Sequence, residues 1–337
     1  MPGVRKHGEE IRSFILNNIT ENSNFAVLTS QQFSISLTAV YKHVDRLVLE
    51  NQLIKKAGHY QLKSKQYKYT YSNDGTLSED SVWEKDIKKH FMDAPQNLWR
   101  MWTYGFLEMF NNAIEHSKGK KINVIVCENK IYTALSIYDD GIGIFKNIKT
   151  IFNLLEEKDA LLELVKGKRT TEAERHSGQG IFFTSKMFDN FYIKSNGITF
   201  NSKPEKECKL DIGKQKYSTY IYMSLSNNSS KTPKDIFDEF STEIPGDFDK
   251  TIVPIHFANS TDLVSRSQAR RVLSGLELFL DVTLDFNDIT YIGQAFADEI
   301  FRVFPIMYPN TAISTINAND DVQYMINRAL NTKLVEQ

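Results

Sequence analysis

The sequence predicts an α+β protein in three parts: a helical N-terminal part, a central unit with the largest sheet, and a C-terminal α/β part. Three observations predict this division. Hydrophobic residues recur at helical spacing within 1–65, strands and one long helix are separated by glycine turns within 83–226, and strands alternate with helices within 249–337. A chain of 337 residues is also too long for one ordinary core.

Composition narrows the functional classes. The chain is 41% hydrophobic and 25% charged, which is typical of a globular protein. Its net charge of -1 argues against a protein that coats nucleic acid, so any DNA contact needs a local patch. No apolar run is long enough to cross a bilayer, and the first residues lack the apolar stretch of a secretory signal. Cys127 and Cys208 match no metal or redox spacing, and we expect a cytoplasmic location.

The order of elements predicted for residues 1–65 resembles a winged helix-turn-helix. Hydrophobic residues at i, i+3, i+4 and i+8 predict a first amphipathic helix, and they are Ile11, Phe14, Ile15 and Ile19. The remaining elements are expected as a short helix at 30–33, a longer helix at 36–49, and an extended pair at 54–57 and 59–62 around Gly58. The extended pair would be the wing.

This N-terminal part is more basic than the whole chain. It holds nine Lys and Arg residues against five Asp and Glu residues, which gives +4. The resemblance implies that the third helix meets a major groove while the wing contacts phosphates. The candidate DNA-binding residues are Ser36, Thr38, Lys42, His43 and Arg46 on the helix and Lys55, Lys56 and His59 in the wing. The alternative is a winged helix that makes protein contacts.

Two polar stretches are predicted to connect the parts. Residues 66–82 lack periodicity and are typical of a linker or of a strand pair with turns. Residues 227–248 are predicted as a second linker. Between them we expect helices at 95–117 and 181–188 and strands at 122–127, 131–138, 191–194, 208–212 and 220–226.

Three separated motifs in the central unit indicate a nucleotide site. In the first, Glu108 and Asn112 are four residues apart on the predicted helix, so both side chains project from one face. A carboxylate beside an amide can hold a water and one ligand of Mg²⁺, which prefers oxygen donors and keeps several waters.

The other two motifs are rich in glycine. In Asp139-Asp140-Gly141-Ile142-Gly143, a strand delivers a carboxylate at its end and two glycines let the backbone approach a ligand. In Gly178-Gln179-Gly180, a glycine turn opens a helix, and the free N–H groups of such a turn suit phosphate. Each motif alone is weak, but the three together are a strong signal.

In this order the motifs resemble the N, G1 and G2 boxes of the GHKL ATPase superfamily. That superfamily includes gyrase-type topoisomerases, mismatch-repair ATPases, sensor histidine kinases and anti-sigma-factor kinases. The resemblance covers about 83–226 and implies a Bergerat-type α/β sandwich that binds ATP and Mg²⁺. The sequence departs from the pattern at His176, where many members carry a further glycine, and this affects the expected details of lid closure.

The resemblance implies a role for each residue. Asp139 would accept a hydrogen bond from the adenine amino group, Asn112 would ligate Mg²⁺, and Glu108 would be the base that activates water or a substrate hydroxyl. Gly141 and Gly143 would line the base pocket. The implied phosphate contacts are Gly178, Gln179 and Gly180, together with Lys168, Arg169 and Thr170 in a mobile lid over about 145–177.

The implied activity is ATP hydrolysis, and two alternatives stay open. One is a protein-serine kinase resembling anti-sigma-factor kinases, and the other is a nucleotide-gated binding module without turnover. Glu108 at the base position favours hydrolysis. No helix with a phosphoacceptor His followed by an acidic residue precedes the unit, which argues against a sensor histidine kinase. Lid closure over ATP is expected to bring two copies together as a homodimer.

The C-terminal part resembles the STAS-like domain of anti-sigma-factor antagonists, through the stretches Ser265–Leu273 and Leu284–Ile300. Such antagonists carry a phosphorylated serine where this chain has Gln294 and Ala295 after Gly293, so the usual phospho-switch is not expected. Arg266, Arg270 and Arg271 would bind an acidic partner or form a solvated helix end. Strands are predicted at 251–257, 282–286 and 311–316, and helices at 266–279, 293–304 and 320–330.

Together the resemblances imply a Bergerat-type GHKL domain flanked by a winged helix and a STAS-like α/β domain. Its nucleotide state is expected to control binding of DNA by the N-terminal part or of a protein by the STAS-like part. The setting is transcriptional control or bacterial defence, and the sequence does not choose between them.

Overall fold

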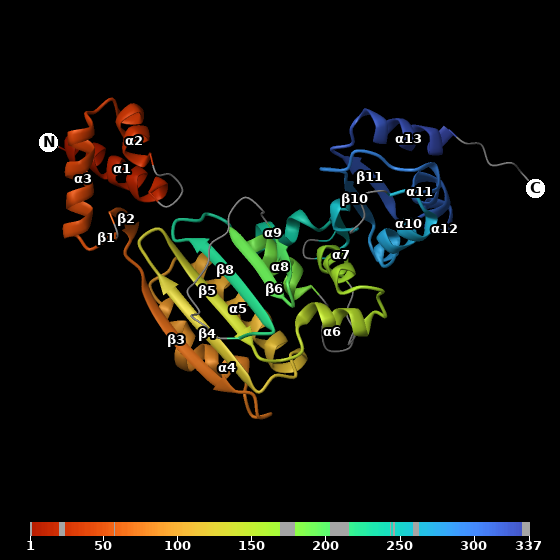
Figure 1. Ribbon diagram of the computed structural model, residues 1–337, viewed down its shortest axis with the longest axis horizontal. Helices are drawn as coiled ribbons and strands as arrows, with labels where there is room; N and C mark the ends of the chain where they lie inside the picture. Colours follow the sequence, from red (N-terminus) through yellow and green to blue (C-terminus); the bar gives the residue numbers. More distant parts are fainter. Residues whose placement is uncertain are drawn as a thin grey trace, which may run out of the picture.

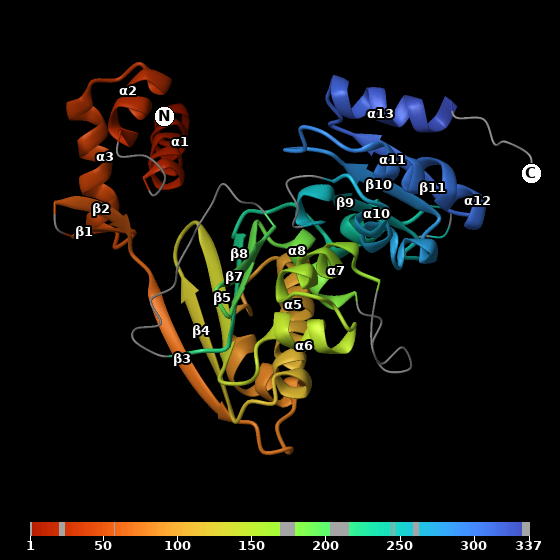
Figure 2. The same ribbon diagram turned by 45° about the vertical axis from the view of Figure 1, so that its right-hand side comes forward.

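The computed structural model describes residues 2–19, 24–56, 58–168, 179–202, 216–242, 244, 247–258 and 263–331, with side chains from residue 7. Figures 1 and 2 show the N-terminal helices and the C-terminal part standing apart from each other, over opposite sides of the central sheet. None of the helices in these ranges is long and apolar enough to cross a membrane.

The N-terminal part contains three helices followed by an antiparallel hairpin. The elements are α1 (Pro2–Asn18), α2 (Phe25–Phe33), α3 (Leu37–Leu49), β1 (Leu53–Lys56) and β2 (His59–Leu62). Ile15, Val40 and Val44 are fully buried in a small core of its own, which also receives the partly buried Ile131 and Tyr132 of the central unit. The order of elements is the one that the sequence predicts, although α2 begins earlier than 30.

Residues 66–82 contain regular structure rather than a plain linker. Strand β3 (Lys65–Ser72) pairs along its full length with β4, and Ser78 caps the short helix α4 (Glu79–Val82). Tyr67, Tyr69 and Tyr71 alternate with more exposed residues and pack against the central core. Tyrosine is amphipathic, so this edge strand lacks the aliphatic pattern that identifies most strands.

The central sheet has six antiparallel strands in the order β3-β4-β5-β8-β6-β7. The further strands are β4 (Lys121–Glu128), β5 (Tyr132–Asp139), β6 (Asn190–Ser195), β7 (Ile198–Asn201) and β8 (Thr219–Ser226). Antiparallel pairing of β5 with β8 sets Asp139 opposite Thr219. The strand expected at 208–212 lies outside the described residues.

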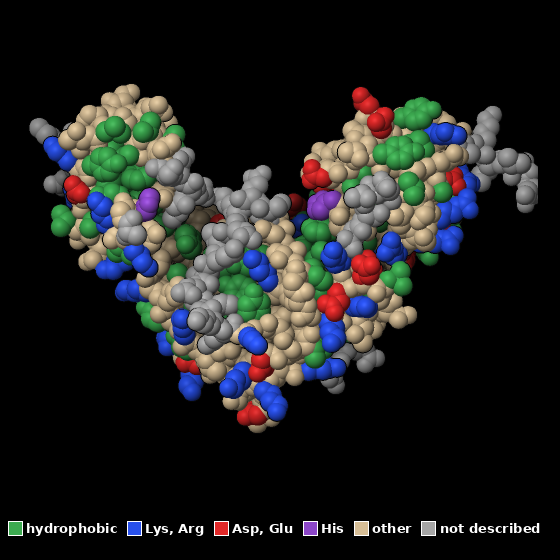
Figure 3. Space-filling model, in the orientation of Figure 1, with side chains coloured by type: hydrophobic (Ala, Val, Ile, Leu, Met, Phe, Trp, Pro, Cys, Tyr) green, Lys and Arg blue, Asp and Glu red, His purple; other side chains and the backbone are tan. Residues whose placement is uncertain are grey.

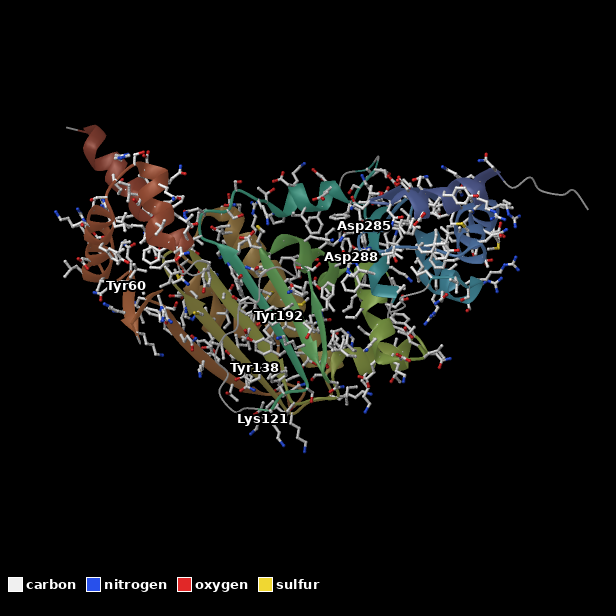
Figure 4. All side chains as sticks on the ribbon, turned by 45° about the horizontal axis from the view of Figure 1, so that its top comes forward. Tyr60, Lys121, Tyr138, Tyr192, Asp285 and Asp288 are labelled. Atoms are coloured by element: carbon white, nitrogen blue, oxygen red, sulfur yellow. The ribbon has the colours of Figure 1, made fainter. Side chains whose placement is uncertain are left out.

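Helices cover one face of this sheet. The long helix α5 (Gln96–His116) buries Trp102, Phe106 and Phe110 against it, and α8 (Gly180–Met187) lies beside α5 (Figure 2). The short elements η1 (Trp83–Ile87) and η2 (Lys88–His90) extend the helical layer. On the opposite face Tyr138 and Tyr192, labelled in Figure 4, lie in a cluster with Tyr220 and Tyr222.

The charged stretch after the second motif forms helices α6 (Ile144–Ile151) and α7 (Ala160–Lys166), with η3 (Glu157–Asp159) between them. Helix α7 ends at Gly167, whose φ of 83° is in the left-handed region that favours glycine. The segment expected to be a mobile lid therefore contains three helical elements up to Gly167, the last of which ends at Lys166.

Residues 227–248 also form more than a linker. Helix α9 (Pro233–Glu239) begins with a capping box in which Thr232 and Asp235 bond each other's backbone. The rings of Phe237, Phe240 and Phe248 pack against Phe182 and Phe183 of α8. These phenylalanines are scattered among polar residues, and their common burial depends on tertiary contacts that no local pattern shows.

The C-terminal part has a parallel three-stranded sheet in the order β11-β10-β9. Its strands are β9 (Lys250–Pro254), β10 (Asp281–Asp285) and β11 (Ala312–Ile316). Its helices are η4 (Ile255–Ala258), α10 (Arg266–Leu273), η5 (Leu276–Leu278), α11 (Gln294–Asp298), η6 (Glu299–Val303), α12 (Phe304–Met307) and α13 (Asp320–Asn331). Buried residues of the central unit and of this part form one continuous core.

Candidate functional site

Helix α5 holds the two residues of the first motif at the border of its buried face. Met109 and Ala113 point into the core, whereas Glu108 and Asn112 are half-buried. Gly105, one turn earlier, lets Phe188 approach the helix, since a Cβ at 105 would lie 2.5 Å from that ring. Sequence reasoning did not single out Gly105, because the need for a glycine there arises from a contact with a distant segment.

The first and third motifs meet in space. The carboxylate of Glu108 lies against the backbone of Gly180, the first residue of α8, and a Cβ at position 180 would collide with it. Burial raises the pKa of Tyr104 on the same helix, and the charge of Glu108 raises it further. Glu108 therefore faces the amino end of α8, where the resemblance requires the phosphates.

Asp139 ends β5 as a buried carboxylate with 4% of its surface exposed. The Gly141 N–H donates to its Oδ1 at 2.9 Å. Burial raises the pKa of Asp139 to about 6, although the hydrogen bonds from Gly141 and Thr219 act in the opposite direction. A carboxylate in this position can accept a hydrogen bond in a dry environment.

Thr219 is a site residue that sequence reasoning missed. It is the first residue of β8, it is 4% exposed, and its side chain bonds the Asp139 carboxylate. Its hydroxyl also accepts from the N–H of Ile144, the first residue of α6, at 3.1 Å. The pairing of β8 with β5 places it there, and the sequence carries no local signal for that pairing.

The glycines of the second motif are required by contacts within the protein. A Cβ on Gly141 would overlap the backbone of Ser117, whose carbonyl accepts from Ile142 N–H at 2.8 Å. Gly143 has a φ of 89°, and a Cβ there would lie 2.6 Å from Ser195 Oγ. The motif thus fits closely between the end of α5 and the β6–β7 turn.

The neighbouring Asp140 has a different role from Asp139. Its Oδ1 accepts from the backbone N–H groups of Lys120 and Lys121, at 2.8 and 2.9 Å. Lys121, labelled in Figure 4, begins β4 at the same end of the sheet. Asp140 therefore joins two loops, and only the first carboxylate of the pair is buried.

The side chain of Lys168 is directed towards the C-terminal part. Its ammonium donates to the carbonyl of Leu278 at 2.7 Å and lies 4.9 Å from the centre of the Phe279 ring. Burial lowers the pKa of Lys168. The structure thus differs from the expected phosphate contact, because α7 and its end pack on the C-terminal part.

The other expected phosphate contacts have mixed outcomes. Gln179 directly precedes α8, and its carbonyl accepts from Phe183 N–H at 2.9 Å, so it begins the helix. Arg169, Thr170 and Gly178 lie outside the described residues. Of the predicted site residues, the structure brings Glu108 against Gly180, and it packs Gly141 and Gly143 against the ends of α5 and β6. Asn112 is half-buried on α5, Asp139 ends β5, and Gln179 precedes α8.

The candidate DNA-binding residues lie in a mixed surface. Ser36 caps α3, because its hydroxyl accepts from Ala39 N–H, and Arg46 is bonded to Glu50 at 2.8 Å. Thr38, Lys42, Lys55, Lys56 and His59 are exposed, and Lys55 lies 5.3 Å from the centre of the Tyr60 ring. His43 is partly buried, and burial with the charges of Arg12 and Arg46 lowers its pKa.

Hydrophobic residues share the outer face of α3. Leu37, Tyr41 and Leu49 are 46%, 43% and 82% exposed. Figure 3 shows hydrophobic and basic side chains side by side on the N-terminal part. This surface suits a protein contact as well as a phosphate backbone, and its geometry alone does not select DNA.

Comparison with known protein families adds one finding. Residues 268–323 match a STAS-like domain of unknown function (DUF4325), a range that runs from α10 into α13. The STAS-like prediction is thereby confirmed for this part of the chain. A comparison with curated proteins finds no match.

Proposed function

We propose that the central unit binds Mg-ATP between α5, the end of β5 and the start of α8, and that it hydrolyses the nucleotide. One observation carries the proposal above the others. Glu108 and Gly180, from two motifs far apart in the sequence, lie in direct contact at the amino end of a helix. The motif resemblance requires this juxtaposition, and neither residue needs the other to complete the hydrophobic core.

The end of β5 supplies the site for the adenine ring. Asp139 and Thr219 together present a buried carboxylate and hydroxyl, which are the groups that recognise an exocyclic amine beside a ring nitrogen. Ionised Asp139 would accept from the adenine amino group. Because the pair lies at the end of two central strands, its position is fixed by the sheet.

The other end of the site suits phosphate and Mg²⁺. The first N–H groups of α8 have no acceptor within the helix, and the helix dipole favours negative charge there. Mg²⁺ usually takes one or two protein oxygens beside phosphates and water, and Asn112 supplies one, with Glu108 beside it on the same face of α5. Bound Mg²⁺ would neutralise phosphate charge, while Glu108 would orient and deprotonate the attacking water.

A regulatory role follows from the flanking parts. We propose that nucleotide binding controls a protein contact of the STAS-like part, and DNA or protein binding by the N-terminal part. ATP would act by bringing two central units together as a homodimer. A ligand can shift such an equilibrium only by its different affinity for the two states.

The test uses Glu108→Gln, which removes the base but keeps the side-chain volume beside Gly180. We expect phosphate release to fall by about 10²–10⁴-fold, the usual contribution of a general base, while an ATP analogue still binds. The matched control is Glu115→Gln, on the same helix and exposed. Unchanged phosphate release in Glu108→Gln would exclude it as the base.

The same assay separates the alternative activities. Labelled γ-phosphate appearing on a protein rather than in water would indicate a protein kinase. Binding of ATP with no phosphate release above background would indicate a nucleotide-gated module. Failure of the wild-type protein to bind ATP, measured by calorimetry with Mg²⁺ present, would overturn the proposal itself.

A further inference from the structure

The segment that follows the second motif is fastened to the STAS-like part by a buried lysine. Lys166, at the end of α7, has 1% of its side chain exposed. Its ammonium donates to Glu163 Oε1 at 3.0 Å, to the Arg271 carbonyl at 2.8 Å and to the Ser274 carbonyl at 2.9 Å. All three N–H donors of the ammonium are therefore used, and two of their acceptors lie in the C-terminal part.

The two carbonyls belong to the end of α10. The last carbonyls of a helix have no partner within it, and the helix dipole makes this end attractive to a cation. Arg271 lies in the last turn of α10, and Ser274 follows its final residue. Lys166 thus supplies from α7 the cap that the sequence of α10 does not provide.

Other contacts act at the same place. Thr251 of β9 donates through its hydroxyl to the carbonyl of Lys166 at 3.3 Å, and Lys168 donates to the Leu278 carbonyl. The side chain of Arg271 lies 3.4 Å from that of Asp159. Each of these bonds joins residues 159–168 to β9, to α10 or to η5.

The ends of the same segment lie at the candidate nucleotide site. At its start, Ile144 N–H donates to Thr219, which bonds Asp139. At its end, Gly167 is packed so closely on Phe182 of α8 that a Cβ would lie 2.5 Å from the ring. A displacement of α6 and α7 therefore changes the surroundings of both the proposed adenine site at Asp139 and the start of α8.

The interface between this segment and the STAS-like part is not completely filled. A cavity of about 130 Å³ lies between α7, α10 and the residues that follow α6, lined by Phe152, Leu162, Gln268 and Arg271 among others. Closely packed interfaces resist displacement, whereas unfilled volume beside polar contacts permits an alternative arrangement. The polar bonds of Lys166 then restrain the position of α7 together with its buried apolar residues.

We propose that the STAS-like part restrains α6 and α7 through Lys166 and thereby lowers the affinity of the nucleotide site. This inference rests on the proposed function and names its regulation. ATP binding draws the segment towards the phosphates and loosens the bonds of Lys166 to α10. By reciprocity, a protein that binds the STAS-like part and displaces α10 from α7 raises the affinity for ATP.

The test removes the restraint without leaving a buried charge. Lys166→Met alone would leave Glu163 buried without its cation, so the variant is Lys166→Met/Glu163→Gln. We expect a gain in affinity for a non-hydrolysable ATP analogue of about fivefold or more, the lower range of allosteric coupling. Lys158→Met, at an exposed position of the same segment, should leave the affinity unchanged. Unchanged or weaker binding by the folded double variant overturns the restraint.

A second measurement needs no variant. In the wild-type protein, the ATP analogue should increase hydrogen exchange at the last turn of α10, around Arg271, because the bonds of Lys166 loosen. Exchange that stays the same or decreases there, in a protein that binds the analogue, contradicts the restraint and leaves the nucleotide site intact. Absence of analogue binding by the wild-type protein overturns both proposals.

Discussion

The carboxylate of Glu108 and the backbone of Gly180 lie in contact, with no room for a side chain at position 180. The contact joins the middle of α5 to the first residue of α8. The two helices also pack together where Phe188 approaches Gly105. The contact of Glu108 with Gly180 fixes where a carboxylate stands relative to the free N–H groups of a helix. This relationship yields a prediction that depends on geometry alone.

Gly180→Ala should destabilise the protein and displace Glu108. Forcing an additional methyl group into a filled position costs about 1–3 kcal/mol. Glu108→Ala removes the group that the methyl would strike, so the double variant should be less destabilised than the sum of the single changes. Thermal unfolding of all three proteins measures this coupling. Gly8→Ala is the control, since a Cβ there has ordinary contacts, and additive effects of the two site changes would contradict the contact.

Asp139→Asn should weaken ATP binding severely. The amide presents a donor where the adenine amino group also donates, and the loss of a hydrogen bond to a charged group costs about 1.5–3 kcal/mol, or roughly ten- to a hundredfold in affinity. Calorimetry with Mg-ATP checks this. Asp140→Asn is the matched control, because Asp140 bonds two backbone N–H groups and is exposed. Wild-type affinity in Asp139→Asn would remove Asp139 from the site.

The same substitution should stabilise the protein without nucleotide at pH 8. The folded-state pKa of Asp139 is about 6 against an ordinary value of 3.8, so the folded protein binds this proton more tightly than the unfolded chain. The stability that the group contributes is fully present below about 3.8 and is lost as the pH rises through about 6. A rise in the pKa from 3.8 to about 6 corresponds to about 3 kcal/mol of folding stability.

Thermal unfolding of the wild type and of Asp139→Asn between pH 4 and pH 8 provides the measurement. Asp139→Asn cannot ionise, so its advantage over the wild type should grow between pH 4 and pH 7 and then level off, as the raised pKa of about 6 requires. A constant difference between the two melting temperatures from pH 4 to pH 8 would show that Asp139 has an ordinary pKa.

Much of the fold was predictable from local pattern. The apolar face of α5 and the β-branched runs of β4 and β5 predicted these elements to within one residue, and the strand expected at 220–226 is β8. The C-terminal α/β part followed from alternating strands and helices, and the STAS-like resemblance is confirmed over 268–323. These elements have strong internal periodicity, and their burial agrees with their propensity.

The remaining features depend on contacts between distant segments. Strand β3 and helix α9 are too polar to be recognised alone, and they form because tyrosines and phenylalanines in them reach a shared core. In the site, Asp139 was predictable from its motif, whereas Thr219 entered only through strand pairing. Lys168 is held by the C-terminal part, an interaction between two regions that sequence reasoning treated separately.

The acidity of Asp139 also predicts how nucleotide affinity varies with pH. The ionised carboxylate accepts more strongly from the adenine amino group than the protonated acid does, so affinity should fall as the pH decreases through about 6. The decrease below that value is at most about tenfold per pH unit. Phosphate groups of the ligand titrate nearby, and Asp139→Asn measured in parallel separates their contribution. An identical pH profile in both proteins would assign the whole dependence to the ligand.

The N-terminal part allows a test between DNA and protein as its partner. Lys42 is exposed on α3 and Lys56 is exposed on β1, whereas the charge of Arg46 is partly neutralised by Glu50. If the surface binds DNA, Lys42→Glu and Lys56→Glu should each weaken binding to duplexes of any sequence. Each should also reduce the slope of log affinity against log salt by about 1, because one phosphate contact releases about one counterion.

Fluorescence anisotropy with labelled duplexes at several salt concentrations measures both quantities. Lys158→Glu makes the same charge change on an exposed position of the central unit, and it should alter neither affinity nor slope. Arg46→Ala should have a smaller effect than Lys42→Ala, since part of its charge is already paired at 2.8 Å. A wild-type protein without measurable DNA affinity at low salt would instead assign this surface to a protein contact. The exposed Leu37, Tyr41 and Leu49 would then be its apolar centre, because water-exposed hydrophobic groups on one helix face gain most by burial against a partner.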